Sequence, residues 1–336
     1  MANRANPAGA DRSEPRFDLS VVIVNWNTLR ELEECLRSVR KAGSRGTEVV
    51  VIDNASPDGS AEMVRRKFAD VRLIENRENL GFAKAANHGI SASHGRYVFL
   101  LNPDAEVHPG ALAALVHFGD DNADVGIFGP KILNPDGSIQ YSCRRFPTLA
   151  AGIFRNSFLG RLFANNPYTR EYLMADWDHN EPRDVDWVSG AALVARRDLL
   201  DDVGPLDERF FMYCEDVDLA YRAKQKGWRV MYFPGATVVH ARARSSDQDP
   251  NRMIAEFHKS MYRFFKKHYA AESSIVTRML VPAGLFLRAT AFITHNHWNR
   301  CKSGVARCLR RRLRPAREAR RPKVIKPTDR SRPDEP

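Results

Sequence analysis

The amino-acid sequence predicts an α/β fold, in which a mostly parallel β-sheet is flanked by helices and followed by a helical C-terminal extension and a basic tail. Two observations predict the sheet: short apolar runs recur along the first part of the chain, and stretches of helical length separate them. This alternation is typical of βαβ units. The apolar runs are Leu19–Val24, Val49–Ile52, Val71–Ile74 and Tyr97–Leu101, and the helical stretches lie near Leu29–Arg40, Ala61–Phe68 and Phe82–Ile90.

The composition is that of a globular protein in a reducing compartment. The 336 residues are 43% hydrophobic and 28% charged, which is enough apolar content for a core and excludes a disordered chain. The five cysteines are odd in number and form no C-x-x-C pair, which argues against a disulfide framework and a structural zinc site. Residues 1–17 lack the apolar segment of a signal peptide, so we expect a disordered N-terminus on a cytoplasmic protein.

The positive charge of the chain is concentrated near its C-terminus. Residues 299–336 contain 14 Lys and Arg against 4 Asp and Glu, a net +10 of the total +11, which leaves about +1 for residues 1–298. A neutral body without a basic, aromatic-lined face argues against a nucleic-acid partner. We expect residues 301–336 to be a flexible tail that is either simply solvated or attracted to an anionic membrane surface.

Polar residues follow each of the four predicted strands. They are Asn25 and Asn27 after the first strand, Asp53 and Asn54 after the second, Glu75 and Asn76 after the third, and Asn102 and Asp104 after the fourth. Because open α/β sheets bind ligands at the carboxyl ends of their strands, these residues are expected to face one crevice.

The sequence lacks the glycine-rich motifs of two common nucleotide-binding folds, which limits the ways in which it could bind a phosphate group. No G-x-G-x-x-G follows the first strand and no G-x-x-x-x-G-K-[ST] occurs, which disfavours a dinucleotide fold and a P-loop. A bound diphosphate would then need a cation rather than a nest of backbone N–H groups. Asp53 could accept a hydrogen bond from a nucleobase or ribose, or it could cap the turn that follows it.

Candidate catalytic residues lie in the second half of the chain. Glu215 and Asp216 belong to a cluster of three carboxylates at the start of a predicted helix, which is either a response to the positive helix N-terminus or a catalytic site whose apolar surroundings raise a carboxyl pKa. His240 ends an apolar run and is either a structural residue or a ligand. Trp187 precedes a turn of small residues at Gly190 and could stack on an acceptor sugar or belong to the core.

Five segments occur in this order along the chain: "VVIVNWNTLRELEECLRSV", "EVVVIDNASPDGS", "NLGFAKAANHGI", "YVFLLNPDAEV" and "FFMYCEDVDLAYRAKQKGWRVMYFPGATVVH". Together they resemble the inverting family-2 glycosyltransferases with the GT-A fold, especially bacterial rhamnosyltransferase-like members. The similarity covers about Leu19 to His240. It implies a Rossmann-like GT-A domain whose nucleotide-sugar-binding half is residues 18–125 and whose acceptor-binding and catalytic half is residues 126–245.

The resemblance implies roles for individual residues. Asp53 contacts the base or ribose, and Asp104 binds a divalent cation, Mg²⁺ or Mn²⁺, on the nucleotide diphosphate. Asp216 of the Glu215-Asp216 pair is the general base, and His240 completes the metal site. The remaining candidates are Asn25, Asn27, Asn54, Gly81, Asn87, Asn102 and Gly190 for the nucleotide sugar, and Trp187 and Glu215 for the acceptor.

The metal-binding segment departs from the family pattern. The D-x-D of the family reads Asn102-Pro103-Asp104 here, so one carboxylate is replaced by a neutral amide. Mg²⁺ commonly uses one or two carboxylates with substrate phosphates and water, so a metal site that is weak until donor binds is expected.

The pattern after Ala241 is helical, and residues 246–300 are predicted to be a helical extension that associates with membranes. Ile275–Ile293 is apolar but contains Arg278, Pro282, Gly284 and Arg288, which disfavours a spanning helix. An interfacial helix followed by a basic tail would form a two-signal membrane anchor. The alternative is a helix that packs its apolar face on the catalytic body.

The sequence therefore predicts an inverting glycosyltransferase of cell-wall or polysaccharide biosynthesis, peripheral on the inner face of the cell membrane. It would move a sugar, rhamnose from dTDP-rhamnose or a sugar from another donor such as a UDP-sugar, to a hydroxyl of a cell-surface glycan or polyprenyl-linked acceptor. Two other classes are weighed against it. A nucleotidyltransferase would usually have a glycine-rich loop after Val24, which is absent, and a nucleic-acid-binding protein would need a basic body.

Overall fold

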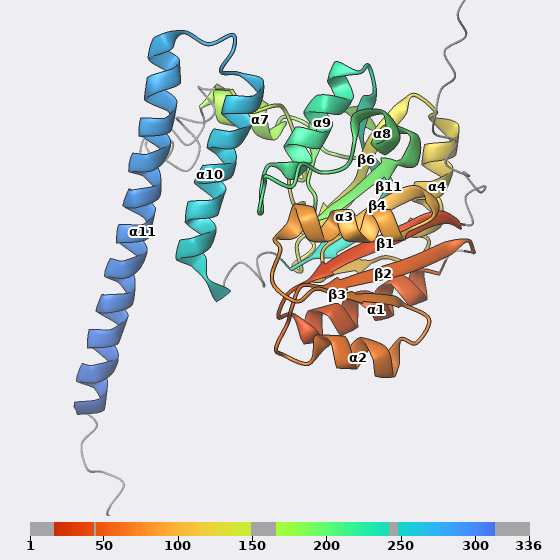
Figure 1. Cartoon of the computed structure of the whole chain (residues 1–336), viewed down its shortest axis with the longest axis horizontal. Coiled ribbons are helices and arrows are strands. Elements are labelled where there is room, and N and C mark those ends of the chain that lie inside the picture. The colour runs from red at the N-terminus through yellow and green to blue at the C-terminus, as the bar shows by residue number, and fades with distance from the viewer. Residues whose placement is uncertain (1–16, 44, 149–165, 242–247, 313–336) are drawn as a thin grey trace, which may run out of the picture. The chain divides into compact units, whose positions relative to one another are not determined.

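The computed structural model describes residues 17–43, 45–148, 166–241 and 248–312. The chain divides after Phe286 into two compact units, of which the first contains the α/β body. The elements of this body are arranged around one large sheet (Figure 1).

The central sheet of the described chain has nine strands in the order β3-β2-β1-β4-β10-β6-β11-β5, with β8 paired to β11. A separate two-stranded ribbon joins β7 and β9. The strands are β1 (Phe17–Asn25), β2 (Thr47–Asp53), β3 (Arg72–Glu75), β4 (Gly95–Leu101), β5 (Ala105–Val107), β6 (Val125–Leu133), β7 (Cys143–Arg144), β8 (Arg183–Asp184), β9 (Trp187–Val188), β10 (Ala192–Arg196) and β11 (Arg229–His240).

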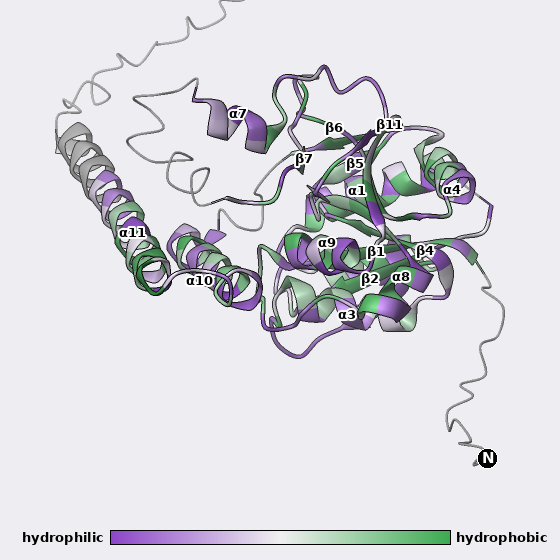
Figure 2. Cartoon of the chain, turned by 90° about the horizontal axis from the view of Figure 1, so that it is seen from above, coloured by the Kyte–Doolittle hydropathy of each residue, from purple (hydrophilic) through white to green (hydrophobic). Residues whose placement is uncertain are grey.

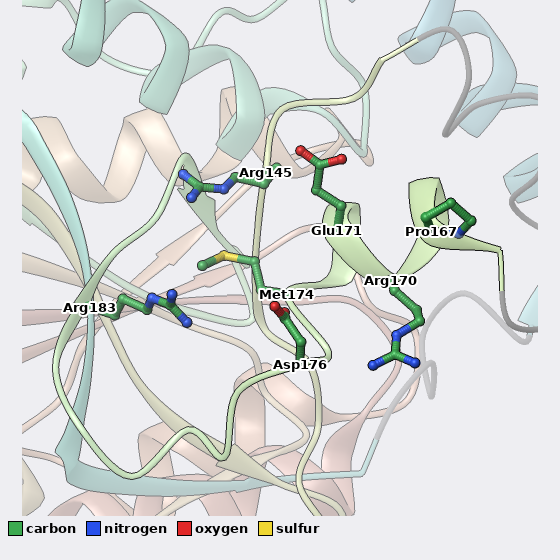
Figure 3. Close-up of a pocket in the computed structure, with 7 residues that line it drawn as sticks. All are labelled: Arg145, Pro167, Arg170, Glu171, Met174, Asp176 and Arg183. Atoms are coloured by element: carbon green, nitrogen blue, oxygen red, sulfur yellow. The ribbon is translucent and has the colours of Figure 1, made fainter.

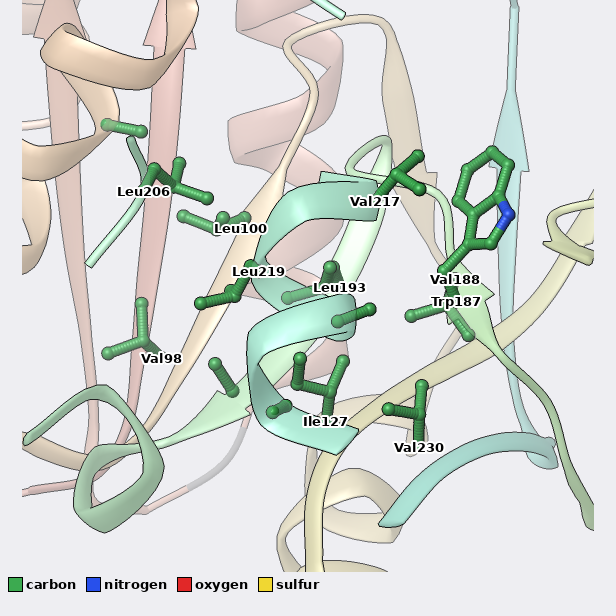
Figure 4. Packing of buried hydrophobic residues seen from close by; sticks show 14 of the residues in the cluster. Val98, Leu100, Ile127, Trp187, Val188, Leu193, Leu206, Val217, Leu219 and Val230 are labelled. Atoms are coloured by element: carbon green, nitrogen blue, oxygen red, sulfur yellow. The ribbon is translucent and has the colours of Figure 1, made fainter. Parts of the chain in front are cut away.

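Helices cover both faces of this sheet. Alternate residues of β1 point to opposite faces, so Val22 and Val24 pack with α3, α8 and α9, whereas Val21 and Ile23 pack with α1, α2 and α4. Figure 4 shows the first of these two cores, where Leu219 of α9 lies near Leu193 and Ile127 of the sheet. The described helices are α1 (Leu29–Ala42), α2 (Ser60–Lys67), α3 (Phe82–Ala92), α4 (Ala111–Asp121), α7 (Pro167–Leu173), α8 (Arg197–Val203), α9 (Glu215–Gln225), α10 (Pro250–His268) and α11 (Ile275–Arg312).

The predicted βαβ half is confirmed, and the second half makes the sheet mixed. Strands β3, β2, β1 and β4 are mutually parallel, as their alternation with helices requires. Strand β10 then pairs antiparallel with both β4 and β6, and β5 and β8 pair antiparallel with β11. A buried strand after the small-residue turn at Gly190 was expected from the sequence, and β10 is that strand; its antiparallel pairing does not follow from the alternation of strands and helices.

A buried ionic cluster joins α9 to α10. Asp218 is fully buried, and its Oδ1 lies 2.6 Å from both Lys267 Nζ and His268 Nε2, while Arg222 Nε donates to its Oδ2 at 2.9 Å. Burial opposes ionisation of Asp218, but the bonds from His268 and Lys267 outweigh it and hold the pKa of this carboxyl below its ordinary value. One of the three acidic residues at the start of α9 is therefore structural.

Helix α11 begins with exposed apolar side chains. Ile275 and Met279 are 75% and 69% exposed, and the first turns of the helix are coloured hydrophobic in Figure 2. Among the described helices, α11 is long and apolar enough to cross a membrane, over Ile275–Asn299. Pro282 lies inside the helix without ending it.

Asp218→Asn should destabilise the fold by about 3 kcal/mol at neutral pH, because it leaves Lys267 and Arg222 without their buried counter-ion. The folded-state pKa of Asp218 is lowered, so its contribution is present above the unfolded-state pKa and is lost as pH falls through the folded-state pKa. The difference in unfolding free energy between mutant and wild type should thus shrink in acid. Urea denaturation at several pH values measures it.

Asp184→Asn is the matched control for this prediction. Asp184 also pairs with an arginine, Arg229, but its side chain is 56% exposed. Exposed ion pairs are worth about 0–1 kcal/mol, so this variant should be almost neutral. A loss for Asp218→Asn no larger than that of Asp184→Asn would contradict the role of the cluster.

Candidate active site

The candidate active site lies where the carboxyl ends of β1, β2 and β4 meet the start of α9. The Asn102 N–H, just after β4, donates to the Ala191 carbonyl at 2.9 Å. Gly190, the residue before Ala191, donates its N–H to Asp216 Oδ2 at 2.9 Å. The two segments that the sequence assigns to cation and base are thus joined through two consecutive residues.

The ends of β1 and β2 are tied together by side-chain hydrogen bonds. Asp53 accepts from Asn25 Nδ2 and from the Ser56 N–H, each at 2.9 Å, and both side chains are buried. Asp53 therefore caps its turn. The predicted contact with a base or ribose would use the lone pairs of its carboxylate oxygens that these two bonds leave free. Asn27, with a left-handed φ of 54°, exchanges two hydrogen bonds with Gln248.

Other predicted donor-site residues organise the neighbouring loops. The Asn54 amide donates to the Gly81 carbonyl at 3.2 Å. Gly81 has a φ of +83°, and an added Cβ would collide with the Phe211 carbonyl, so only glycine fits there. The Asn87 amide donates to the Leu206 carbonyl at 2.8 Å and accepts from the Leu206 N–H at 3.1 Å. Donor binding by these residues stays a prediction.

Asp104, His240 and Asn102 converge on one point. Asp104 Oδ1 lies 3.1 Å from His240 Nε2, and Asn102 Nδ2 lies 3.2 Å from the same nitrogen. Strand β11 delivers His240 because its last residues pair with β5, which follows Asp104 in the chain. The predicted metal-site residues are thus brought together.

Gln140, which the sequence analysis missed, sets the orientation of the His240 ring. The Gln140 Nε2 donates to Asn134 Oδ1 at 2.9 Å and to the His240 carbonyl at 3.2 Å, so its Oε1 faces His240 Nδ1, at 2.8 Å. An amide oxygen can only accept, so Nδ1 carries the hydrogen, and Nε2 is the ring nitrogen left to face Asp104 and to serve as a cation ligand. A ring nitrogen beside a carboxylate oxygen suits a divalent cation.

The donor set for a cation is small. Within the described residues, no group of three or more His, Cys, Asp or Glu side chains is gathered as a metal site. Asp104 and His240 would supply two ligands, with Asn102 beside them, and a cation held there would complete its shell with phosphate oxygens and water.

Glu215 and Asp216 are adjacent carboxylates in different surroundings. Both Asp216 oxygens accept a backbone hydrogen bond, from Gly190 at 2.9 Å and from Val217 at 2.8 Å. Glu215 is 6% exposed, and its Oε2 has no partner among the described residues. The environment therefore favours the anion on Asp216.

The pKa directions agree with this difference. Burial, followed by the charge of Asp216, raises the pKa of Glu215 well above its ordinary value. Burial also raises the pKa of Asp216, but the two N–H bonds and the charge of Arg144 oppose that rise. A difference of this kind between two neighbouring carboxyls fits the prediction that Asp216 is the base, which stays a prediction.

The loop before this pair is strained and held from two sides. Tyr213 and Cys214 have left-handed φ values of 71° and 66°, which side chains other than glycine rarely adopt. The Phe211 carbonyl accepts from the first N–H of α3 at 2.6 Å, and the Met212 carbonyl accepts from Ser260 Oγ of α10 at 2.8 Å. Helix α10 is thereby part of the support of the candidate base.

Trp187 lies in the core. It is 5% exposed, its Nε1 donates to the Arg145 carbonyl at 2.8 Å, and the Arg144 guanidinium lies 4.9 Å from the centre of its ring. This placement fits the alternative of a core tryptophan and leaves little ring surface on which an acceptor sugar could stack.

A surface hollow of about 450 Å³ lies beside the β7–β9 ribbon (Figure 3). It contains none of the residues predicted for donor, base or cation. Its lining mixes three arginines with two carboxylates: Arg145, Pro167, Arg170, Glu171, Met174, Asp176 and Arg183.

The chain is similar to proteins of known activity. A family model described as glycosyl transferase family 2 matches residues 20–176. An N-acetylglucosaminyl-diphospho-decaprenol L-rhamnosyltransferase of Mycobacterium tuberculosis is 33% identical over 307 residues, which cover 88% of this chain and 97% of that protein. A low-salt glycan biosynthesis hexosyltransferase, Agl10 of Haloferax volcanii, is 25% identical over 269 residues, or 78% of each chain.

Two solved structures share the fold. Crystalline GalNAc-T7 with UDP, GalNAc and Mn²⁺ matches with a TM-score of 0.51 and 18% identity, over 69% of this chain and 45% of that one. TarS of S. aureus matches with a TM-score of 0.50 and 16% identity, over 83% of this chain and 45% of that one. With the family model and the mycobacterial relative, these findings show that the chain belongs to glycosyl transferase family 2 and is a glycosyltransferase with the GT-A fold.

Proposed function

We propose that this glycosyltransferase moves rhamnose from dTDP-rhamnose to a hydroxyl of a sugar that is carried on a polyprenyl diphosphate. The observation that carries the proposal is the 33% identity that extends over 97% of a relative named N-acetylglucosaminyl-diphospho-decaprenol L-rhamnosyltransferase. A UDP-sugar is the alternative donor.

The proposed reaction is a single displacement. Asp216 takes the proton from the acceptor hydroxyl while that oxygen attacks the anomeric carbon, and the nucleoside diphosphate leaves from the opposite side. One C–O bond forms as one breaks, so the anomeric configuration inverts. The backbone N–H groups of Gly190 and Val217 hold both oxygens of Asp216 in place.

Asp104 and His240, with Asn102 beside them, would hold Mg²⁺ or Mn²⁺. A cation at this point would offset the negative charge that develops on the departing diphosphate. The Gln140 amide supports this assignment because it leaves His240 Nε2 facing Asp104.

We further propose that the enzyme works on the cytoplasmic face of a membrane. The exposed apolar start of α11 would enter the bilayer, and the basic segment after it would bind anionic headgroups. Such a location fits an acceptor on a polyprenyl chain. The sequence favours an interfacial helix, whereas the length of Ile275–Asn299 also permits a spanning one.

Asp216→Asn should lower transfer of rhamnose to a polyprenyl-diphosphate-linked N-acetylglucosamine by about 10²–10⁴-fold, because the amide cannot accept the proton. Binding of dTDP should be unchanged. Glu215→Gln, which resembles the protonated carboxyl, should lose less activity than Asp216→Asn. Mass spectrometry of the lipid product measures transfer, and near-normal turnover of Asp216→Asn would remove this residue from the mechanism.

Gln140→Ala should weaken Mn²⁺ binding to the dTDP-bound enzyme by about 10- to 100-fold, because the His240 ring loses the partner that orients it. Electron paramagnetic resonance of free Mn²⁺ measures this affinity without turnover. Asn122→Ala is the matched control, since that amide donates to the Phe118 carbonyl at the end of α4 instead. Equal Mn²⁺ affinity in Gln140→Ala and wild type would count against an oriented His240 ligand.

The full chain should sediment with anionic liposomes at low salt and be released at high salt, because each Lys or Arg near such a surface contributes about 1 kcal/mol that salt screens. A chain that ends at Ala270 should stay in the supernatant and still bind dTDP. Retention at high salt with release by detergent would indicate a spanning helix. If the full chain does not sediment with the liposomes at low salt, the proposed membrane anchor is contradicted.

A further inference from the structure

Among the described residues, Arg144 forms no ion pair with a carboxylate, although its charge acts on the candidate base, Asp216. Arg144 stands opposite Trp187 in the β7–β9 ribbon, and its guanidinium carbon lies 4.9 Å from the Trp187 ring and 5.9 Å from the Tyr172 ring. Its Nη2 donates to the Tyr141 carbonyl at 3.2 Å, whereas its buried Nε has no partner in the described part of the chain. Its neighbour Arg145 is different, because that side chain is exposed and faces Asp186 at 3.6 Å.

The segment from Gln140 to Arg144 first contacts His240 of the predicted cation site and then the loop that supports Asp216. It ends at Arg144. Gln140 contacts His240, and the carbonyl of Ser142 accepts from the Ser189 N–H at 2.7 Å, next to the Gly190 that holds the base. Arg144 follows Ser142 by two residues, and its guanidinium turns back to the Tyr141 carbonyl. An extended chain rises about 3.3 Å per residue, so four residues span at most about 13 Å.

This order matches the geometry that the reaction needs. The donor diphosphate belongs with Asp104 and His240, and the acceptor hydroxyl belongs at Asp216. An acceptor sugar that is itself linked through a diphosphate carries its second negative group one sugar ring beyond the reacting hydroxyl. Arg144 follows, in the same segment, the residue that contacts the support of the base, and its charge favours ionised Asp216.

We propose that Arg144 binds the diphosphate through which the acceptor sugar is attached to its lipid, an inference that rests on the proposed function. A guanidinium presents several N–H donors in a plane and forms paired, charge-assisted hydrogen bonds to phosphate oxygens. The rings of Trp187 and Tyr172 hold it in position without neutralising it. The enzyme would in this way select a diphosphate-linked sugar over the same sugar on a neutral carrier.

The test compares two acceptors that differ only in charge: N-acetylglucosamine on a short polyprenyl diphosphate, and N-acetylglucosamine on a neutral alkyl chain. In the full chain, Arg144→Ala should raise KM for the diphosphate acceptor by about 10- to 100-fold, the loss expected for charge-assisted hydrogen bonds. KM for the neutral acceptor and the affinity for dTDP should stay within about twofold. Arg145→Ala is the matched control, and Arg144→Lys should lie between wild type and alanine.

Three results would overturn the proposal. One is an equal rise in KM for both acceptors, which would mean that Arg144 only supports the fold or the base. Another is a fall in dTDP affinity, which would place Arg144 on the donor diphosphate. The third is unchanged binding of the diphosphate acceptor to Arg144→Ala in calorimetry.

Calorimetry also separates this proposal from the proposed function. Binding of the diphosphate acceptor does not require transfer, so it tests Arg144 even if no rhamnose is moved. A wild-type enzyme that binds this acceptor through Arg144 but transfers no rhamnose to it would contradict the proposed donor alone. Thermal unfolding of each variant confirms that it is folded.

Discussion

The antiparallel pairing of β10 with β4 is the contact on which the candidate active site depends. Ala192 pairs with Leu101, so the Asn102 N–H reaches the Ala191 carbonyl at the edge where the parallel strands end. The N–H of Gly190, one residue earlier, holds Asp216. A strand from the second half of the chain thus carries the support of the candidate base to the edge that presents Asp104. Without this pairing, Asp104 and Asp216 would lie on segments that these hydrogen bonds do not connect.

Glu215, Asp216 and Asp218 lie in the first turn of α9, and their different hydrogen-bond partners suit them to different roles. Asp216 has two backbone N–H donors and is suited to be an anion that accepts a proton, whereas Glu215 is buried with an unpaired oxygen and is suited to stay protonated. Asp218 is fixed by Lys267 and His268 and holds α10 against α9. Helix α10 in turn supports the strained loop before Glu215 through Ser260. Helix α10 is therefore part of the catalytic body rather than an appendage to it.

The sequence predicted the parts of this site that follow a periodic pattern and missed the parts that depend on tertiary contacts. Buried apolar runs end at a defined residue, so the positions of Asp53, Asp104 and His240 at strand ends could be foreseen. Gln140 lies in an irregular segment, and only the fold brings it to His240, 100 residues away. The role of Arg144 could not be predicted for the same reason. The pattern around Trp187 fits both a core residue and a sugar-binding residue, and its 5% exposure favours the core.

We propose that one displacement, with Asp216 as the base, completes the transfer. No second nucleophile is needed, so the sugar is attached with the opposite anomeric configuration to that of the donor. The one-bond carbon–hydrogen coupling at the anomeric centre of the purified product, measured by NMR with dTDP-rhamnose of known configuration, reports this directly. The account predicts an inverted centre. A retained centre would require a covalent sugar–enzyme intermediate or a different attacking geometry, and would contradict it.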